Sequence, residues 1–341
     1  MSAVTNPASE STPRPTPKPD SMLTSDLTSK RKSKRKSTPD STAWKTPKRN
    51  AWDDPRGWRR IGRYALLIGV SIVVLFPVYT TVIAAFKPSN RLFDNPLLPD
   101  GFTLDLIREA WTSGRLGTYL WNSLLVATIV TFAQVATSLL SGYAFAYLRF
   151  PGRKLVFLAF LATLLVPLEA TVVVNFDTMQ SLGDGVTLPI LGWTLPTWLG
   201  GLNTLQGLTV PFLATAFGTF LMRQALLSLP SDLRDAARID GIGHLGFIRH
   251  VGIPLVRPTL AALALFSFLS TWNQYLWPSL VISDQDRHTV QSGLRLLSKS
   301  NLDAPNLVMA GTIIAAVPIL IVLVVFQRQL VRGLTAGAVK G

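Results

Sequence analysis

The chain has 341 residues, of which 48% are hydrophobic and 15% are charged, and its mean hydropathy is +0.33. This composition is too apolar and too poor in charge for an ordinary soluble domain. The formal net charge is +14, and the absence of cysteine excludes disulfides and thiolate metal sites.

Residues 1–60 are rich in Ser, Thr, Pro, Lys and Arg and contain few apolar residues. Such a segment buries too little apolar surface to fold, so we predict a disordered, basic cytoplasmic tail. One interpretation of its basic cluster, residues 30–36, is nucleic-acid binding by a membrane-anchored scaffold protein. We favour a solvated tail that contacts anionic lipid and no nucleic acid, because a membrane span follows and no folded nucleic-acid module is recognisable.

Six apolar stretches follow, each long enough or nearly long enough to cross a hydrocarbon core of about 30 Å. We predict spans at residues 64–86, 120–146, 155–176, 207–228, 258–282 and 307–327. The first begins near Tyr64, far from the N-terminus, which favours an uncleaved first span over a signal peptide. The sequence therefore predicts an all-α membrane protein with six transmembrane helices, in a domain that covers residues 61–341.

Lysine and arginine residues orient these spans. With the N-terminus inside, the inside segments hold 26 of the 33 Lys and Arg residues, and the outside loops hold 7. Without the N-terminal tail the ratio is 11 to 7, in the same direction. The positive-inside rule thus places both termini in the cytoplasm.

Prolines and small residues predict how the spans pack. Pro77 and Pro167 lie inside the first and third spans, where prolines often kink a helix. Ser138, Gly142 and Ala146 form a row at a spacing of four on the second span. Such a row lets a neighbouring helix come close, so we interpret it as a packing surface.

The segment 177–206 lies between the third and fourth spans and is predicted to face outside. It is rich in Gly and Pro and contains no Lys or Arg. An interfacial loop at the headgroup level and a docking surface for an external partner fit it equally well.

Residues 229–257 form a polar, arginine-bearing loop between two apolar stretches. The pattern predicts a short helix that ends at Gly241, a turn, and a second short helix. Ser231 is the predicted N-cap, and Asp232 and Asp235 are expected in the first turn, where acidic groups suit the helix dipole. An ordered loop of this kind on a membrane protein indicates that a partner binds there.

The sequence does not predict an enzyme. No G-x-x-x-x-G-K-[ST] phosphate loop is present, so ATP hydrolysis is expected only from a partner. His244 and His250 are six residues apart, which is not the spacing of a helical metal pair, and we expect no metal or cofactor. A stand-alone, ion-coupled carrier is the competing hypothesis, and Glu169 is its clearest ionisable candidate.

Several motifs together resemble the permeases of bacterial ABC importers of the carbohydrate, maltose-type family. The run from Asp235 to Gly241, followed by Ile253-Pro254, resembles the family's EAA loop, although the family usually has Glu in place of Asp235. The other matching motifs are Asn122-Ser123, Gly142–Ala146 with Arg149–Gly152, Phe220–Gln224, Trp272–Pro278 and Gln327–Gly341. Within the family, Trp272–Pro278 with Ile282–Asp284 looks most like the second permeases of glycerol-3-phosphate importers.

The resemblance covers residues 64–341 and implies a MetI-like ABC permease fold in the bacterial cytoplasmic membrane. It implies a permease subunit that carries a carbohydrate or a glycerol-3-phosphate-type solute, with other di- or oligosaccharides as an alternative. The implied partners are a second permease, a dimer of ATP-binding subunits, an extracytoplasmic solute-binding protein and membrane lipid.

The resemblance also assigns ATPase coupling to the first loop helix. The implied coupling residues are Arg234, Asp235, Ala236, Ala237, Arg238, Asp240 and Gly241. The charged members are expected to make polar contacts with the ATPase, and the two alanines to keep the helix slim enough for its cleft.

Polar groups inside spans are costly unless they pair or face water, which identifies candidates for the solute pathway. These candidates are Glu169, Trp272, Asn273, Gln274 and Tyr275. Trp272 would stack on a sugar ring, or alternatively belong to an interfacial belt, with Asn273 as a contact between helices. No Lys or Arg lies in the middle of a predicted span, so phosphate recognition is expected of the partners.

Overall fold

The structure is a computed structural model that describes residues 57–92, 95, 97–99, 101–188 and 193–336. The predicted basic tail lies outside the described residues, apart from its last few positions. The chain divides into units 1–63 and 64–341. The described part of the first unit is the beginning of helix α1.

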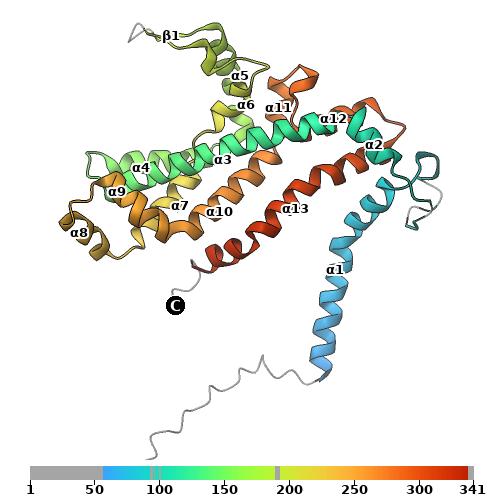
Figure 1. Ribbon diagram of the computed structural model, residues 1–341, viewed down its shortest axis with the longest axis horizontal. Coiled ribbons are helices and arrows are strands. Elements are labelled where there is room, and N and C mark those ends of the chain that lie inside the picture. The colour runs from blue at the N-terminus through green and yellow to red at the C-terminus, as the bar shows by residue number, and fades with distance from the viewer. Residues whose placement is uncertain (1–56, 93–94, 96, 100, 189–192, 337–341) are drawn as a thin grey trace, which may run out of the picture. The chain divides into compact units, whose positions relative to one another are not determined.

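The described residues are mostly helical (Figure 1). The helices are α1 Gly57–Ala85, α2 Asp105–Thr112, α3 Leu116–Tyr147, α4 Arg153–Ala162, α5 Leu168–Asp184, α6 Leu205–Thr209, α7 Ala216–Leu227, α8 Ser231–Ile239, α9 His244–Phe247, α10 Ile253–Trp272, α11 Leu276–Val281, α12 Val290–Ser300 and α13 Pro305–Ala336. The strands β1 Thr187–Leu188 and β2 Trp193–Thr194 pair antiparallel, with Thr187 opposite Thr194. The one-turn helices are η1 Ser89–Arg91, η2 Thr163–Leu165, η3 Thr197–Leu199, η4 Val210–Phe212, η5 Ile248–Gly252 and η6 Gln285–Arg287.

Four described helices are long and apolar enough to cross a membrane, and two bent helix pairs raise the number to six. The four are Arg60–Ala85, Leu116–Tyr147, His244–Trp272 and Pro305–Gln327. The all-α prediction is confirmed. Pro77 lies inside α1 without interrupting it.

The third predicted span, 155–176, is not one straight helix. It consists of Arg153–Leu165 and Glu169–Asp184, which meet at an angle of 105°. Pro167 stands at the break, and Val166 before it has the extended backbone that a following proline imposes. Because proline also lacks an N–H group, the helical hydrogen bonding cannot continue through this position.

The fourth predicted span, 207–228, also bends, by 46° between Leu205–Phe212 and Ala216–Leu227. The bend leaves backbone carbonyls without a partner in their own helix, and α3 satisfies two of them. Gln134 Nε2 donates to the Phe212 carbonyl at 2.8 Å, and Thr137 Oγ1 donates to the Leu213 carbonyl at 3.0 Å. Polar side chains of a neighbouring helix thus make this broken span possible.

The fifth predicted span ends earlier than predicted. A continuous helical stretch runs from His244 to Trp272, through α9, the π-turn η5 and α10. The predicted end at residue 282 is wrong because the apolar stretch is broken after Trp272 and resumes as the separate helix α11. Asn273 closes α10, because its backbone N–H and its side-chain Nδ2 both donate to the Leu269 carbonyl, at 3.1 and 2.8 Å.

Helix α3 is the element on which the others pack. It contacts α7, α10, α12 and α2, and α10 in turn packs on α13 (Figure 1). The predicted small-residue row lies at the α3–α7 contact, where a Cβ atom on Gly142 would lie 2.7 Å from Met222 Cβ. Ser141 and Thr219 also share a hydrogen bond of 2.7 Å there. The row is therefore a packing surface, as predicted.

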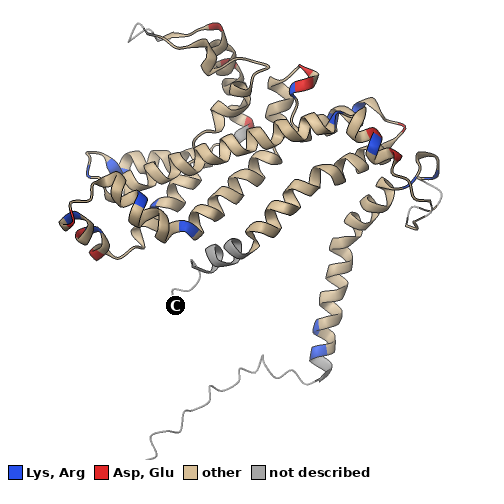
Figure 2. Ribbon diagram, in the orientation of Figure 1, with Lys and Arg blue, Asp and Glu red and all other residues tan. Residues whose placement is uncertain are grey.

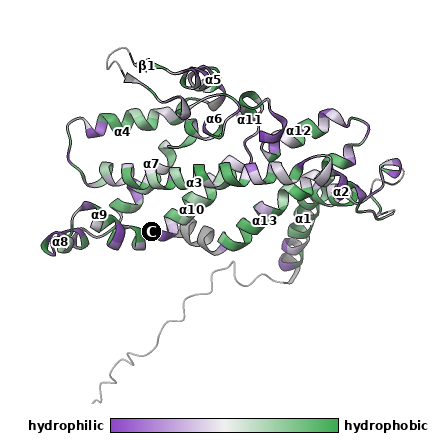
Figure 3. Ribbon diagram, turned by 45° about the horizontal axis from the view of Figure 1, so that its top comes forward, coloured by the Kyte–Doolittle hydropathy of each residue, from purple (hydrophilic) through white to green (hydrophobic). Residues whose placement is uncertain are grey.

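Charge and hydropathy separate along these helices. The middles of α3, α10 and α13 carry almost no charge, and arginines gather around α8 and α9 (Figure 2). The long helices are mainly hydrophobic, with hydrophilic residues concentrated at their ends and in connecting loops (Figure 3). We call the two ends of this helix group the α8 end and the α12 end.

Candidate functional site

The loop at the α8 end has the predicted helix, glycine turn and second helix. Helix α8 ends at Ile239, and Gly241 follows with a φ of +72°, a conformation that favours glycine. The Gly241 N–H donates to the Arg238 carbonyl at 3.1 Å, and the Ile242 N–H donates to the Ala237 carbonyl at 2.8 Å. These two bonds form a Schellman motif, which closes the helix at the predicted residue.

The start of α8 differs from the prediction. Ser231 is the first residue of the helix and Pro230 precedes it, so the serine does not cap the backbone N–H groups. Its hydroxyl instead donates to Asp232 at 3.3 Å. Asp232 lies in the first turn and Arg238 in the last, which matches the sign of the helix dipole at both ends.

The inner face of α8 packs on the chain itself. Ala237 is 4% exposed and belongs to an apolar cluster that includes Tyr143 and Leu226. The guanidinium of Arg234 lies 5.4 Å from the centre of the Tyr147 ring. Among the predicted coupling residues, Arg234 and Ala237 therefore face α3, so Ala237 is occupied with intrachain packing.

The outer face of α8 is open. Asp235, Ala236, Arg238 and Asp240 are exposed on it or just after it. Ile239 is 87% exposed and Leu233 is 37% exposed, and sequence reasoning had given neither a role. A large apolar side chain so exposed on a polar helix is typical of a surface that a partner covers.

Three of the five predicted pathway residues line one pocket. This cavity has a volume of about 220 Å³, and Glu169, Gln274 and Tyr275 contribute to its wall. The remaining lining residues are Val172, Asn175, Phe212, Leu276 and Trp277. The break after α10 and the break before α5 bring these residues together, which a straight span in either place would not do.

The other two predicted pathway residues lie elsewhere. Trp272 is 2% exposed and stacks on Phe268 with ring centres 5.6 Å apart, inside an apolar core. It does not line the pocket, and its indole nitrogen has no hydrogen-bond partner in the described structure. Asn273 is exposed, and its side chain is used to close α10.

Arg295 on α12 is a cation beside the pocket that sequence reasoning missed. Its guanidinium lies 5.3 Å from the centre of the Tyr275 ring. Helix α12 lies between two spans, so Arg295 is not a charge inside a predicted span. The signal available in the sequence was the presence of only three basic residues in the loop before the last span: Arg287, Arg295 and Lys299.

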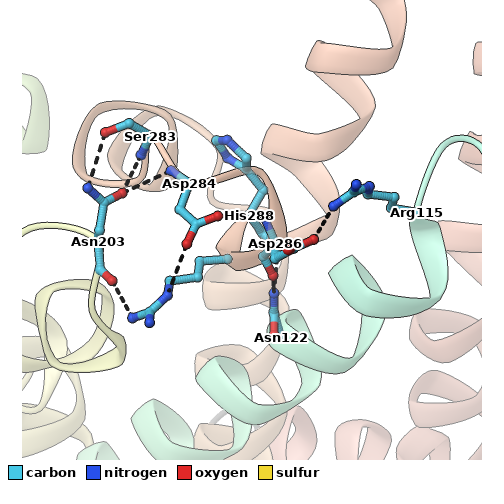
Figure 4. A network of polar contacts seen from close by, with 8 residues as sticks. Arg115, Asn122, Asn203, Ser283, Asp284, Asp286 and His288 are labelled. Carbon is cyan, nitrogen blue, oxygen red and sulfur yellow. Dashed lines mark hydrogen bonds and ion pairs between the residues drawn. The ribbon is translucent and has the colours of Figure 1, made fainter.

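A network of polar contacts joins three segments at the α12 end (Figure 4). The Asn203 side chain accepts hydrogen bonds from the backbone N–H groups of Ser283 and Asp284, at 2.6 and 3.0 Å. Arg287 forms an ion pair with Asp284 at 3.4 Å and donates to the Asn203 carbonyl. The loop after α11 is thereby held to the segment before α6.

Helix α3 completes this network. Asn122 Nδ2 donates to the carbonyls of Asp286 and His288, at 2.8 and 3.1 Å (Figure 4). Arg115, just before α3, forms an ion pair with Asp286. These partners are far apart in the sequence, and no local pattern predicted their contact.

His288 lies at the inner edge of the network and is 6% exposed. Its Nδ1 is 3.2 Å from the Ser292 hydroxyl, and its ring meets Tyr119 edge to face. Burial lowers the pKa of His288 below its ordinary value of 6.5, and the negative charge of Asp284 opposes this shift only in part. The structure therefore favours the neutral imidazole.

The arrangement of these helices is that of ABC importer membrane subunits. A chain from a bacterial ABC transporter that imports the acidic polysaccharide alginate superimposes with a TM-score of 0.67 at 21% identity, covering 81% of this chain and 98% of that one. A second structure, of an alginate ABC transporter in complex with its alginate pentasaccharide-bound periplasmic protein, gives a TM-score of 0.57 at 15% identity, covering 81% and 99%. At these identities the likeness concerns the fold.

Sequence comparison gives the family. Residues 134–336 match the family described as the binding-protein-dependent transport system inner membrane component, and the chain belongs to it. The sn-glycerol-3-phosphate transport system permease protein UgpE of Yersinia enterocolitica is 36% identical, covering 79% of this chain and 93% of the relative. UgpE of Brucella abortus is 34% identical, covering 80% and 95%. The chain is thus a multi-pass permease subunit of a bacterial ABC importer, in the inner membrane, and not an enzyme.

Proposed function

We propose that this permease carries glycerol 3-phosphate or a closely similar carbohydrate. It works together with a second permease and two copies of an ATP-hydrolysing subunit. A solute-binding protein delivers the solute at the α12 end, and the ATPase binds the α8 end in the cytoplasm. Closure of the ATPase on ATP moves the spans through α8 and exposes the pathway to each side in turn.

The proposal that the ATPase binds α8 rests on the exposed outer face of this helix. Ile239 and Leu233 present apolar surface to solvent on a helix that is otherwise polar there. Asp235 and Asp240 flank them with negative charge. A cleft with an apolar floor and a basic rim on the ATPase would suit this face, because burial of the two side chains is favourable and the charges give orientation.

Ile239→Glu tests this assignment. The change places a charge at the centre of the proposed interface and should abolish co-purification of the ATPase with the C-terminally tagged permease from mild detergent. Since Ile239 is nearly free of intrachain contact, the amount of permease in the membrane should stay the same. Mass spectrometry of the captured complex measures both.

Leu302→Glu is the matched control. Leu302 is 81% exposed and lies between α12 and α13, so the same change of charge occurs at the opposite end of the helices. This variant should retain the ATPase. Retention of the ATPase by Ile239→Glu would contradict the assignment.

The substrate proposal rests on the named relatives and on the pocket. The two UgpE proteins are glycerol-3-phosphate permeases by name, and the structural neighbour belongs to an importer of an acidic polysaccharide. Amide, phenol and carboxyl groups of Gln274, Tyr275 and Glu169 suit a hydroxyl-rich solute. Arg295 beside Tyr275 supplies a positive charge for a phosphate.

Uptake of radiolabelled glycerol 3-phosphate by cells that lack their own transporter, with and without the complete set of subunits, tests the substrate. Competition by unlabelled glycerol 3-phosphate but not by maltose is the expected result. Uptake of maltose that glycerol 3-phosphate does not inhibit would show that the transported solute is a different one. Glu169 in the pocket would also suit an ion-coupled carrier, but membership of the family favours an ATP-driven importer.

A further inference from the structure

Two tyrosines near the end of α3 contact both short helices of the loop at the α8 end. Tyr143 and Tyr147 are four residues apart, so they lie on the same face of the helix. Their rings contact each other edge to face, with centres 5.2 Å apart. The pair forms a platform at the point where α3 approaches the loop.

Tyr143 binds the second half of the loop. Its hydroxyl oxygen and His244 Nδ1 are 2.7 Å apart, which makes this a short side-chain hydrogen bond between α3 and α9. The Tyr143 ring also contacts His244 edge to face and lies 6.2 Å from the Phe247 ring. Tyr143 is 5% exposed, whereas its partner His244 is exposed.

Tyr147 binds the first half. Its hydroxyl donates to the Leu226 carbonyl at the end of α7, and its ring lies under the guanidinium of Arg234 on α8. It also meets Phe247 edge to face at 5.8 Å. The end of α7, α8 and α9 therefore all contact one platform.

A cavity lies beside the platform formed by the two tyrosines. It has a volume of about 570 Å³ and separates part of the loop from α3. Tyr143, Tyr147 and Arg149 line it from the α3 side, and Arg234 and His244 line it from the loop side. Beside this cavity, the bridging side chains connect α3 to the loop together with an apolar cluster that includes Ala237 and Phe247.

We propose that Tyr143 is a positioning residue, whose hydrogen bond to His244 makes α3 follow the coupling loop when the ATPase moves it. The inference rests on the proposed function, because it needs an ATPase on α8. Without the bond, the loop shifts over the cavity while α3 lags behind. ATP hydrolysis then continues, but fewer cycles move solute.

Tyr143→Phe tests the proposal in the complete transporter, reconstituted in liposomes with its solute-binding protein. The change removes one oxygen atom and keeps the ring, so assembly should be preserved. ATP hydrolysed per glycerol 3-phosphate transported should rise about fivefold, the factor that one ordinary hydrogen bond is worth. A purely structural role would lower assembly, hydrolysis and transport together and leave this ratio unchanged.

Variants of the partner identify the bond itself. His244→Ala should raise the ratio as much as Tyr143→Phe, and the double variant should be no worse than either single one. His244→Asn should restore most of the coupling, since its amide places a hydrogen-bonding atom close to the position of Nδ1. Tyr79→Phe is the matched control. It also removes a tyrosine hydroxyl that donates a hydrogen bond, here to the Leu97 carbonyl at 2.9 Å, but it lies outside the loop.

The outcomes separate the two proposals. A wild-type complex with no ATPase-driven uptake of glycerol 3-phosphate would overturn the proposed function. A coupled wild type with an unchanged ratio in Tyr143→Phe would overturn the inference alone. Independent, additive effects of Tyr143→Phe and His244→Ala would also overturn it, since they would show that the two side chains do not act through each other.

Discussion

At the scale of single residues, neighbours from distant parts of the chain decide which predicted side chains are available for function. Trp272 was predicted to stack on a sugar ring or to belong to an interfacial belt, and Ala237 to keep the coupling helix slim, and both are buried within the chain. Ile239 had no assigned role and is the most exposed large apolar residue described on α8. The type of residue could be read from the sequence, but the side of the helix that faces outward could not, because α3 and α9 determine it.

Arg295 gives a prediction at this scale. Arg295→Gln keeps hydrogen-bond donors but removes the charge, so uptake of glycerol 3-phosphate should fall about tenfold or more, the usual size of a charge-assisted contact of about 1.5–3 kcal/mol. Arg295→Lys should retain part of the uptake, because it keeps the charge but loses the planar fork. Initial rates over a range of solute concentrations measure the effect.

The control for Arg295 is Lys299→Gln. Lys299 lies four residues further along α12, and its substitution removes the same charge without touching the contact between Arg295 and Tyr275. Equal losses in both variants would indicate a general electrostatic effect of the outer surface, and no specific role for Arg295.

His288 predicts a dependence of stability on pH. Its folded-state pKa lies below 6.5 because it is buried, so protonation favours the unfolded state. The chain should therefore keep its full stability above about pH 6.5 and lose stability as the pH falls from there through the lower, folded-state pKa. Thermal unfolding in detergent at pH 7.5 and pH 5.5 measures this change.

A His288→Asn variant provides the comparison. It cannot titrate in this range and should lose less stability between the two pH values than the wild type. An equal loss in both proteins would mean that other groups cause the pH dependence.

At the scale of elements, hydropathy identified the helices but not their breaks. Long apolar runs predict spans because a helix satisfies its own backbone groups in lipid. The bend at residues 213–215 and the end of α10 depend on local hydrogen bonding, to which an average over many residues is insensitive, whereas the proline itself predicted a kink at Pro167. Gly241 was predicted correctly, because its turn is set by local backbone chemistry and not by distant neighbours.

The close contact between α3 and α7 gives a prediction for the elements. Gly142→Ala places a methyl group 2.7 Å from Met222 Cβ and 2.9 Å from the Arg223 backbone nitrogen, so the two helices must separate. Overpacking of this kind costs about 1–3 kcal/mol. The Tm in detergent should fall, and differential scanning fluorimetry measures it.

Gly69→Ala on α1 is the matched control. A Cβ atom there meets nothing within 4 Å, and the gain in helix propensity is the same. Its Tm should remain unchanged or rise slightly. A fall of Tm equal to that of Gly142→Ala would contradict the packing argument.

At the scale of the whole described unit, helix α3 makes contacts at both the α8 end and the α12 end. Helix α3 has 32 residues and is about 48 Å long. Asn122 near its start holds the network at the α12 end, and Tyr143 near its end holds the loop at the α8 end. The two ends are therefore connected through a single continuous hydrogen-bonded rod.

This shared rod imposes a thermodynamic reciprocity. Suppose that a protein bound at the α12 end favours one position of α3 over another by some factor. Linkage then requires that whatever favours the same position from the α8 end increases the affinity for the outer protein by that same factor. Binding of the outer protein and the nucleotide state inside then shift the same equilibrium between positions of α3. The effect of the nucleotide state on the affinity for the outer protein therefore equals the effect of the outer protein on the affinity at the α8 end.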